Sequence, residues 1–301
     1  MIKTAIIGAE GFLGRPLLRA HRQFHQDCLG TTQHQDSKEL SHFDLSTPSI
    51  EKLKLKKTGH EAAIIVAALT KIKTCEEDKE KAKRINIDGT LSLINQLWDE
   101  NILPIFFSSD HVFGEHTKHI FSEEDELGPV TEYGKTKATI ETELKNSGKP
   151  FLIVRLGKVL GLQKGDNTLL DEMAGLLIKG KLVRAAYDQI LNPICLEEVV
   201  SGILDCQRAG LRGVVNMCSS ESWTRYDLAL AMAEALGCDR GLVERISLDD
   251  LSQGYRLPKN ITLSNHRLRY LTAFNPSPVS EYIRKTSLNW KECNSLQSKF
   301  F

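Results

Sequence analysis

A glycine-rich turn near the start of the chain constrains the possible fold more than any other feature. Residues 3–7 are mostly apolar and predict a strand, which runs into Gly8-Ala9-Glu10-Gly11-Phe12-Leu13-Gly14 and then into a helix-like stretch. Glycines at these spacings let the backbone turn tightly and point free N–H groups at a pyrophosphate. We therefore expect a dinucleotide-binding cradle, with cofactor contacts from Gly8, Gly11, Phe12, Leu13 and Gly14.

Short runs of apolar residues alternate with helix-like stretches over the first 160 residues. This alternation is typical of βαβ units and predicts an α/β fold with a Rossmann-type, doubly wound parallel sheet. The expected strands are Lys3–Gly8, Asp27–Thr31, Ala62–Ala67, Ile105–Ser109 and Phe151–Leu156, and the expected helices are Gly11–His25, Lys83–Trp98 and Tyr133–Lys145.

The pattern is less regular after Gly161. We expect a helix over Glu197–Gln207, a strand over Gly213–Met217, and a helix that begins at Thr224 or Tyr226, ends at Leu236 and is closed by Gly237. The predicted organisation is a dinucleotide-binding domain of residues 1–160, to which 187–218 return. Residues 161–186 and 219–301 would form a smaller, discontinuous substrate-binding lobe.

Composition limits the classes of partner. Thirty-nine Lys and Arg residues balance 39 Asp and Glu residues, so the charge argues against a nucleic-acid partner. The longest apolar run, Ala62–Leu69, is far shorter than the roughly 20 residues of a membrane span, and no signal peptide is expected. The seven cysteines show no metal-binding spacing, which favours reduced thiols in a cytoplasmic protein without a metal site.

The end of the second predicted strand bears on the choice of cofactor. An NAD site usually offers a carboxylate there, whereas a 2′-phosphate requires a cation. The strand ends at Thr31, the first acid after it is Asp36, and Arg15 follows the third glycine of the turn. This arrangement favours NADP over NAD, with Thr31 and Arg15 at the cofactor. The alternative is that Arg15 is an ordinary solvated residue of the first helical turn.

Tyr133 and Lys137 lie four residues apart in a predicted helix, which places both on one face. A nearby ammonium group lowers the pKa of a phenol and so makes it a better proton shuttle. Ser109 ends a predicted strand, and parallel sheets bind ligands at the carboxyl ends of their strands. We expect these three residues to form a catalytic site.

Three motifs occur in this order: the glycine turn, the segment Ser108-Ser109-Asp110-His111-Val112-Phe113-Gly114, and the pair Tyr133 and Lys137. Together they resemble the extended short-chain dehydrogenase/reductase family, and within it the dTDP-4-dehydrorhamnose reductase branch of nucleotide-sugar reductases. The likeness extends to about residue 285. Further segments that carry it are Asp44-Leu45, Ala67-Ala68-Leu69-Thr70, Asn86-Ile87-Asp88-Gly89-Thr90, Phe121-Ser122-Glu123-Glu124-Asp125, Pro129, Asp188-Gln189 and Arg256-Leu257-Pro258-Lys259-Asn260.

The resemblance implies roles for these residues. Tyr133 would donate a proton to a substrate carbonyl, Ser109 would hydrogen-bond its oxygen, and Lys137 would hold the nicotinamide ribose and lower the pKa of Tyr133. The adenine and the rest of the cofactor would lie along Asp44, Leu45, Ala67, Ala68 and Thr70. Candidates for contact with a nucleotide-sugar substrate are Asp110, His111, Asn167, Arg184, Asp188, Gln189 and Arg256.

The chain also departs from its apparent relatives. Related dehydratases carry Thr-Asp-Glu where this chain has Ser109-Asp110-His111, so dehydration is disfavoured. The segment Arg155–Gly161 lacks the small-hydroxyl and aromatic pattern of the reductases, which leaves the sugar undetermined. Reduction of a 4-keto-6-deoxy sugar nucleotide with NADPH is the first hypothesis. The alternatives are a non-catalytic regulatory subunit, like that of methionine adenosyltransferase, and an epimerase. A homodimer is possible.

Overall fold

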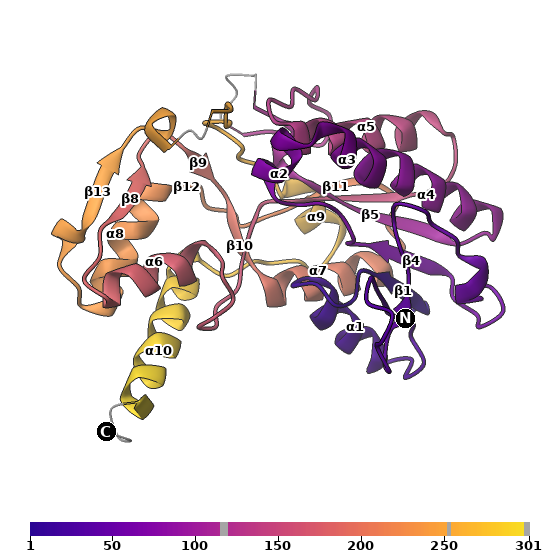
Figure 1. Cartoon of the computed structure of the whole chain (residues 1–301), viewed down its shortest axis with the longest axis horizontal. Coiled ribbons are helices and arrows are strands. Elements are labelled where there is room, and N and C mark those ends of the chain that lie inside the picture. Colours follow the sequence, from indigo (N-terminus) through magenta and orange to yellow (C-terminus); the bar gives the residue numbers. More distant parts are fainter. Residues whose placement is uncertain (115–119, 252–253, 298–301) are drawn as a thin grey trace.

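A computed structural model describes residues 1–114, 120–251 and 254–297, and side chains as far as residue 292. Its centre is a parallel sheet in the order β1-β4-β5-β6-β11. The bounds are Thr4–Ile7 for β1, Ala62–Ile65 for β4, Leu103–Ser109 for β5, Leu152–Leu156 for β6 and Gly213–Met217 for β11. Helices cover both faces of the sheet (Figure 1), so the fold is the doubly wound α/β type expected from the sequence.

Side chains alternate between the two faces of the sheet along each strand, and they pack into two separate hydrophobic cores. Ile6 and Ile64 point into the core formed with α1 (Gly14–Arg22), α7 (Leu196–Arg208) and α9 (His266–Leu271). Ile7 and Ile65 point into the opposite core. Helices of that second layer are α2 (Ile72–Glu77), α3 (Lys79–Lys83), α4 (Thr90–Asp99) and α5 (Glu132–Asn146).

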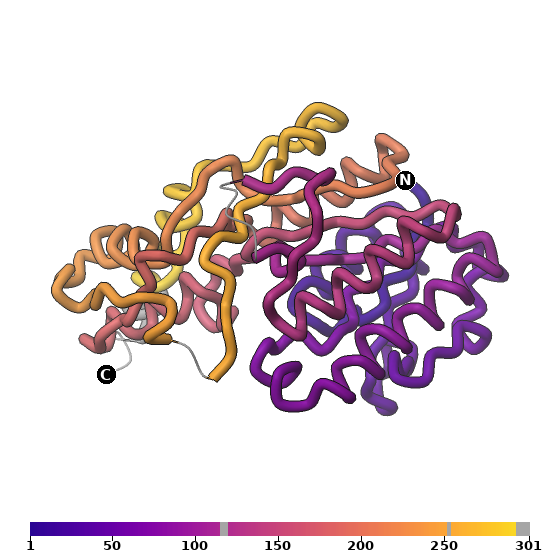
Figure 2. Tube along the Cα trace, turned by 90° about the horizontal axis from the view of Figure 1, so that it is seen from above, coloured from indigo at the N-terminus to yellow at the C-terminus, as the bar shows by residue number. Residues whose placement is uncertain are grey.

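Segments far apart in the sequence meet in the sheet layer. Strand β11 pairs in parallel with β6, from Gly213 opposite Leu152 to Met217 opposite Leu156. The N-terminus lies beside α7 (Figure 2), where the Nε2 of Gln207 donates to the Thr4 hydroxyl at 2.9 Å. The C-terminal half therefore completes the dinucleotide-binding sheet.

A smaller lobe lies beside the sheet (Figures 1 and 2) and has its own core. It contains α6 (Leu169–Ile178), α8 (Arg225–Leu236), α10 (Val279–Gln297) and the parallel pair β8 (Val183–Ala186) and β13 (Val243–Ile246). Short pairs join it to the sheet layer: β7 (Lys158–Leu160) with β10 (Pro193–Cys195), and β9 (Ile190–Leu191) with β12 (Trp223–Thr224). These separate cores are the basis on which we propose the division at residues 160, 186 and 218.

Most expected elements are confirmed within a few residues, including the closure of α8 by Gly237 at φ 75°. Two differ. The strand expected over 27–31 is reduced to β2 (Thr31–Thr32), which pairs with β3 (Ser41–His42). The helix expected over 83–98 begins in α3 and contains a π-helical turn, Arg84–Gly89, before α4. None of the helices in the described ranges combines the length and hydropathy of a membrane-spanning segment.

Candidate active site

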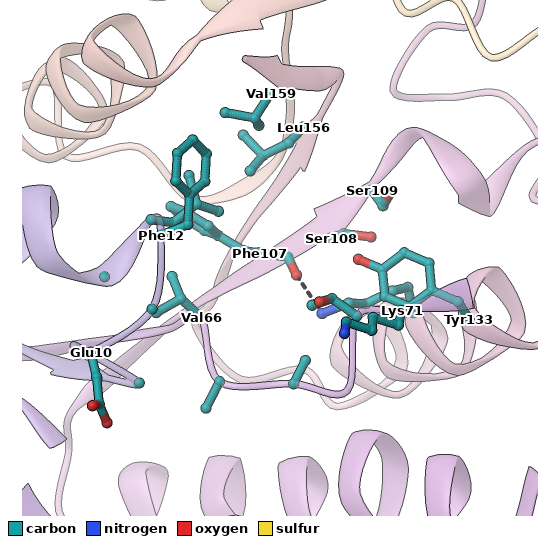
Figure 3. Close-up of a pocket in the computed structure, with 18 of the residues that line it drawn as sticks. Glu10, Phe12, Val66, Lys71, Phe107, Ser108, Ser109, Tyr133, Leu156 and Val159 are labelled. Atoms are coloured by element: carbon teal, nitrogen blue, oxygen red, sulfur yellow. Dashed lines mark hydrogen bonds between the residues drawn. The ribbon is translucent and has the colours of Figure 1, made fainter. Parts of the chain in front are cut away.

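The strands β1, β4, β5 and β6 end at one long cleft with a cavity volume of about 850 Å³. The glycine turn lines one part of it, and Ser109, Tyr133 and Lys137 line another. Figure 3 shows Tyr133 beside Ser108 and Ser109, with Glu10 at the far end and Phe12 on the same side as Leu156 and Val159. The cleft is therefore long enough to hold an extended ligand between the turn and the tyrosine.

The glycine turn fits the diphosphate of a dinucleotide. A Cβ on Gly14 would lie 2.2 Å from the carbonyl oxygen of Gly8, so only glycine permits a turn this tight. The backbone N–H groups of Phe12 and Leu13 donate no hydrogen bond within the described ranges, and they lie just before α1. Free N–H groups at a helix N-terminus are suited to bind phosphate oxygens.

The adenosine end of the cleft contains a carboxylate that the sequence analysis did not identify. Glu10 comes from the glycine turn, accepts a hydrogen bond from the Thr32 hydroxyl, and lies 3.6 Å from Nε2 of His34. Thr31 accepts a hydrogen bond from the Gly8 N–H at 2.9 Å. An acid was expected only after the second strand, whereas Glu10 comes from the turn after the first.

Most residues predicted to bind the cofactor line this cleft, but two do not. Those that line it are Gly8, Gly11, Phe12, Leu13, Gly14, Thr31, Leu45, Ala67, Ala68, Thr70, Tyr133 and Lys137. Arg15 is not part of the lining. Asp44 is not part of it either, and its carboxylate accepts a hydrogen bond from the backbone N–H of Ser46 at 2.8 Å. Arg15 directly follows Gly14, and Asp44 lies between Phe43 and Leu45; Gly14, Phe43 and Leu45 all line the cleft, so contact of Arg15 and Asp44 with the cofactor stays a prediction.

Tyr133 and Lys137 stand on α5, whose first turn is capped by the Thr131 hydroxyl accepting from the Gly134 N–H at 3.0 Å. Nζ of Lys137 lies 5.8 Å from the centre of the Tyr133 ring and donates to the Phe107 carbonyl at 2.8 Å (Figure 3). Burial lowers the pKa of Lys137 to about 8. Lysine and tyrosine thus face the end of β5 together.

Burial raises the pKa of Tyr133 well above its ordinary value, and the charge of Asp110 raises it further, while a hydrogen bond with Ser109 opposes them. The sequence analysis expected Lys137 to lower this pKa. In the structure the net shift of this pKa is upward, with burial as its largest cause, and a lowering of it by Lys137 stays a prediction. The phenol is therefore protonated at neutral pH.

Asp110 and His111 follow β5; Asp110 is buried, and the half-buried His111 has its ring centre 6.1 Å from that of Tyr133. One Asp110 oxygen accepts a hydrogen bond from the Ser109 hydroxyl at 2.7 Å, and Oδ2 has no partner within the described ranges. Burial raises the pKa of Asp110 to about 6. Burial also lowers the pKa of His111 to about 3, so the imidazole is neutral, and its Nδ1 is without a described partner. Both side chains have polar atoms left for a ligand.

The other residues predicted to bind substrate divide into two groups. Asn167 lines the cleft with Asp110 and His111, whereas Arg184, Asp188, Gln189 and Arg256 do not. Arg184 pairs with Glu244 at 3.3 Å, and Asp188 with Lys259 at 2.9 Å. Gln189 donates to the Pro258 carbonyl at 3.1 Å. The contact of Arg184 thus lies within the smaller lobe, and those of Asp188 and Gln189 connect this lobe to the segment 187–218.

A buried ion pair connects α5 to β6. Arg155 on β6 and Glu141 on α5 are fully buried and lie 2.7 Å apart. The Ser108 hydroxyl, next to Ser109, donates to Glu141 at 2.6 Å. This pair joins β5, β6 and α5 one helical turn beyond Lys137, and so it fixes the helix that carries the tyrosine and the lysine. Periodicity alone does not reveal a contact between charges that are distant in sequence.

Comparison with known proteins agrees with this geometry. A family model described as the RmlD substrate binding domain matches residues 2–289. The chain belongs to this family. The resemblance seen in the motifs is thereby confirmed over almost the whole length of the chain.

The individual relatives described next are 20–27% identical to this chain. The chain is 27% identical to the probable low-salt glycan biosynthesis reductase Agl14 of Haloferax volcanii, over 86% of this chain and 88% of the relative. It is 26% identical to the dTDP-4-keto-6-deoxy-D-glucose reductase of Streptomyces niveus, over 88% and 89%. The solved structure of dTDP-4-dehydrorhamnose reductase from Bacillus anthracis, in complex with NADP, shares the fold with a TM-score of 0.83 at 20% identity, covering 96% of this chain and 99% of that one.

Proposed function

We propose that this protein reduces the keto group of a 4-keto-6-deoxy sugar attached to a nucleoside diphosphate, with NADPH as the reductant. The observation that carries the proposal is the convergence of Ser109, Tyr133 and Lys137 on the cleft that the glycine turn also lines. The relatives named as reductases of such sugars support it. The absence of a glutamate at position 111 speaks against elimination chemistry.

The reaction requires one hydride and one proton. A bound reduced nicotinamide supplies the hydride to the carbonyl carbon. The Tyr133 hydroxyl, which is protonated at neutral pH, donates the proton to the carbonyl oxygen. The Ser109 hydroxyl donates a hydrogen bond to the same oxygen. Lys137 is held against Phe107 at the cofactor side of Tyr133, where its ammonium group stabilises the phenolate left after proton transfer.

The described residues suit a nicotinamide dinucleotide. Phe12 and Leu13 would bind its diphosphate through their backbone N–H groups, and Thr31 would lie beside the adenosine. NADPH is supported by the NADP bound in the Bacillus anthracis relative. Glu10 lies near the expected position of the 2′-phosphate, so we expect its charge to reduce, without abolishing, the preference for NADPH over NADH.

The test is loss of NADPH absorbance in the presence of dTDP- and UDP-linked 4-keto-6-deoxy sugars. We expect turnover with at least one of them, and Tyr133→Phe to lower kcat by about 100-fold or more while the Kd for NADPH stays within about twofold. Tight NADPH binding without turnover on any sugar would instead favour the regulatory-subunit alternative. Unchanged kcat in the phenylalanine variant would remove Tyr133 from the mechanism.

A further inference from the structure

The loop between β7 and α6, residues 161–168, is here called the cleft loop. Its last three residues, Asp166, Asn167 and Thr168, line the cleft. No other described residue of 161–186 or 219–301 lines it, so this loop is the part of the smaller lobe that reaches the cleft. The side-chain oxygen of Asn167 accepts no hydrogen bond from the described residues, whereas its amide group donates to the Gly165 carbonyl at 2.8 Å. One polar atom of the loop is thus left for a ligand.

The backbone of the cleft loop has an unusual conformation that its surroundings must hold. Gly165 has a φ of 96° and Asn167 a φ of 53°, and positive values are uncommon for residues other than glycine. Asp171, in the first turn of α6, is buried. Its carboxylate accepts hydrogen bonds from the Asn167 N–H at 2.8 Å and from the Gly165 N–H at 3.1 Å. This one carboxylate therefore fixes both residues of positive φ.

The C-terminal helix α10, which packs against α6 (Figure 1), holds the same loop. The indole Nε1 of Trp290 donates to the Asp171 carboxylate at 2.9 Å. The side-chain amide of Asn289 donates to the Leu162 carbonyl at 2.8 Å. Nζ of Lys164 lies 4.8 Å from the centre of the Trp290 ring. Helix α10 thus contacts the loop directly at two residues and supports two more through Asp171.

We propose that Asn167 contacts the sugar nucleotide and that Trp290 is a positioning residue, which keeps the cleft loop in its binding conformation through Asp171. This rests on the proposed function and adds to it a role for α10. Trp290 is buried and is not among the residues that line the cleft, so it acts through the loop and not by touching the ligand. The family match ends at residue 289, so Trp290 lies just outside the matched part of the chain.

Trp290→Phe tests the proposal, because it keeps an aromatic ring and removes the N–H that Asp171 accepts. A hydrogen bond to a charged group changes an equilibrium by roughly tenfold or more, and a loop that is less often in its binding conformation weakens the apparent affinity in proportion. We therefore expect the KM for dTDP-4-keto-6-deoxyglucose, or for its UDP counterpart, to rise on the order of tenfold. The kcat and the Kd for NADPH should stay within about twofold, since the reacting groups stand on β5 and α5.

A second tryptophan provides a matched control. Nε1 of Trp98 on α4 donates to the Pro150 carbonyl at 2.8 Å, and Nζ of Lys149 lies 4.8 Å from the centre of its ring. These are the same two kinds of contact that Trp290 makes, but Trp98 is not part of the cleft lining. Trp98→Phe should therefore leave the KM for the keto sugar unchanged.

Hydrogen exchange measures the loop itself, without reference to activity. The amides of Gly165 and Asn167 are protected by Asp171, so Trp290→Phe should speed their exchange on the order of tenfold, read by mass spectrometry of peptides that cover residues 162–168. Trp98→Phe should not. Asp171→Asn keeps the shape of the side chain but replaces one acceptor oxygen with an amino group. It should raise both the KM and the exchange rate, and it serves as the test if Trp290→Phe does not fold.

Several results would overturn the inference. A folded Trp290→Phe protein with the wild-type KM would do so, and so would a lower kcat at unchanged KM, because the residue would then act on the reacting groups. A raised KM without faster exchange would also overturn it, since Trp290 would not act through the loop.

Failure of the proposed function would appear differently. If the wild-type protein turns over neither keto sugar, the reductase proposal fails, and the Kd values of dTDP-glucose and UDP-glucose, measured by calorimetry, replace the KM in the comparison of variants. Weaker binding of these probes by Trp290→Phe alone would still uphold the role of α10. Binding of neither probe by the wild-type protein would overturn both proposals.

Discussion

Replacement of Gly134 by alanine tests how closely α5 must approach the turn after β5. Gly134 follows Tyr133, and a Cβ at this position would lie 2.1 Å from the carbonyl oxygen of His111 and 3.1 Å from Cβ of Pro129. An ordinary contact begins near 3.4 Å, so the helix and the turn would have to separate by about 1 Å. The neighbour is backbone and not a flexible side chain, which leaves little other room for adjustment.

The expected effects can be stated in magnitude. Alanine gains about 0.5–1 kcal/mol over glycine in a helix interior, whereas overpacking costs about 1–3 kcal/mol, so the free energy of unfolding should fall by about 1–2 kcal/mol. A displacement of about 1 Å at the reacting groups lowers kcat by about 100-fold. Urea unfolding and the keto-sugar assay measure the two effects.

Gly175→Ala on α6 is the matched control. Its new Cβ would meet only the ring of Trp290, at 3.2 Å, and it lies outside the cleft lining, so kcat should not change and stability should change by less than about 1 kcal/mol. Wild-type kcat in a stably folded Gly134→Ala protein would refute the reasoning, because the position of Tyr133 would then not depend on this contact.

Three further predictions concern charged groups. Glu10→Gln should shift the ratio of Kd values toward NADPH over NADH by about two- to fivefold, measured by fluorescence titration, because a negative charge near the 2′-phosphate is removed; an unchanged ratio would place the phosphate elsewhere. Asp110 has a folded-state pKa of about 6, above its usual value, so its ionisation costs stability as the pH rises from about 4 to 6. Asp110→Asn should therefore raise the free energy of unfolding by about 1–3 kcal/mol at pH 7.5 and have little effect at pH 4; the opposite pH dependence would contradict the burial argument. Glu141→Gln should cost about 3–5 kcal/mol in urea unfolding, because it leaves Arg155 buried and unpaired. The exposed pair of Glu281 and Arg284 serves as the control, and Glu281→Gln should cost less than about 1 kcal/mol.

The positions of the residues proposed as catalytic could be predicted from the sequence because each depends on a local rule. Tyr133 and Lys137 share a face through helical periodicity, and Ser109 ends a strand whose apolar run is easily seen. The glycine turn is contiguous as well. Where a site depends on residues that are close in sequence, the pattern of residues is sufficient to predict it.

Residues that meet through the tertiary fold could not be predicted in this way. Glu10 and Thr32, for example, come from different βα units. Arg184 and Asp188 have the right chemistry for a phosphate or sugar, but they form ion pairs with Glu244 and Lys259. The prediction of a strand over residues 27–31 was wrong for a related reason. Strand β2 contains only two residues, because the preceding segment contacts β1 through single hydrogen bonds, such as the one from the Ile6 N–H to the Leu29 carbonyl at 2.8 Å.

The pairing of β11 with β6 has a consequence for the order of events during synthesis. Strand β6 ends at Leu156 and its partner begins only at Gly213, so about 60 residues must be added before the sheet can close. At ~5–20 residues per second the ribosome needs several seconds for this, while β6 remains an open, apolar edge. Such edges pair readily with other chains. We therefore expect the nascent protein to depend on chaperones during this interval, and slow translation between residues 157 and 213 to lower its yield.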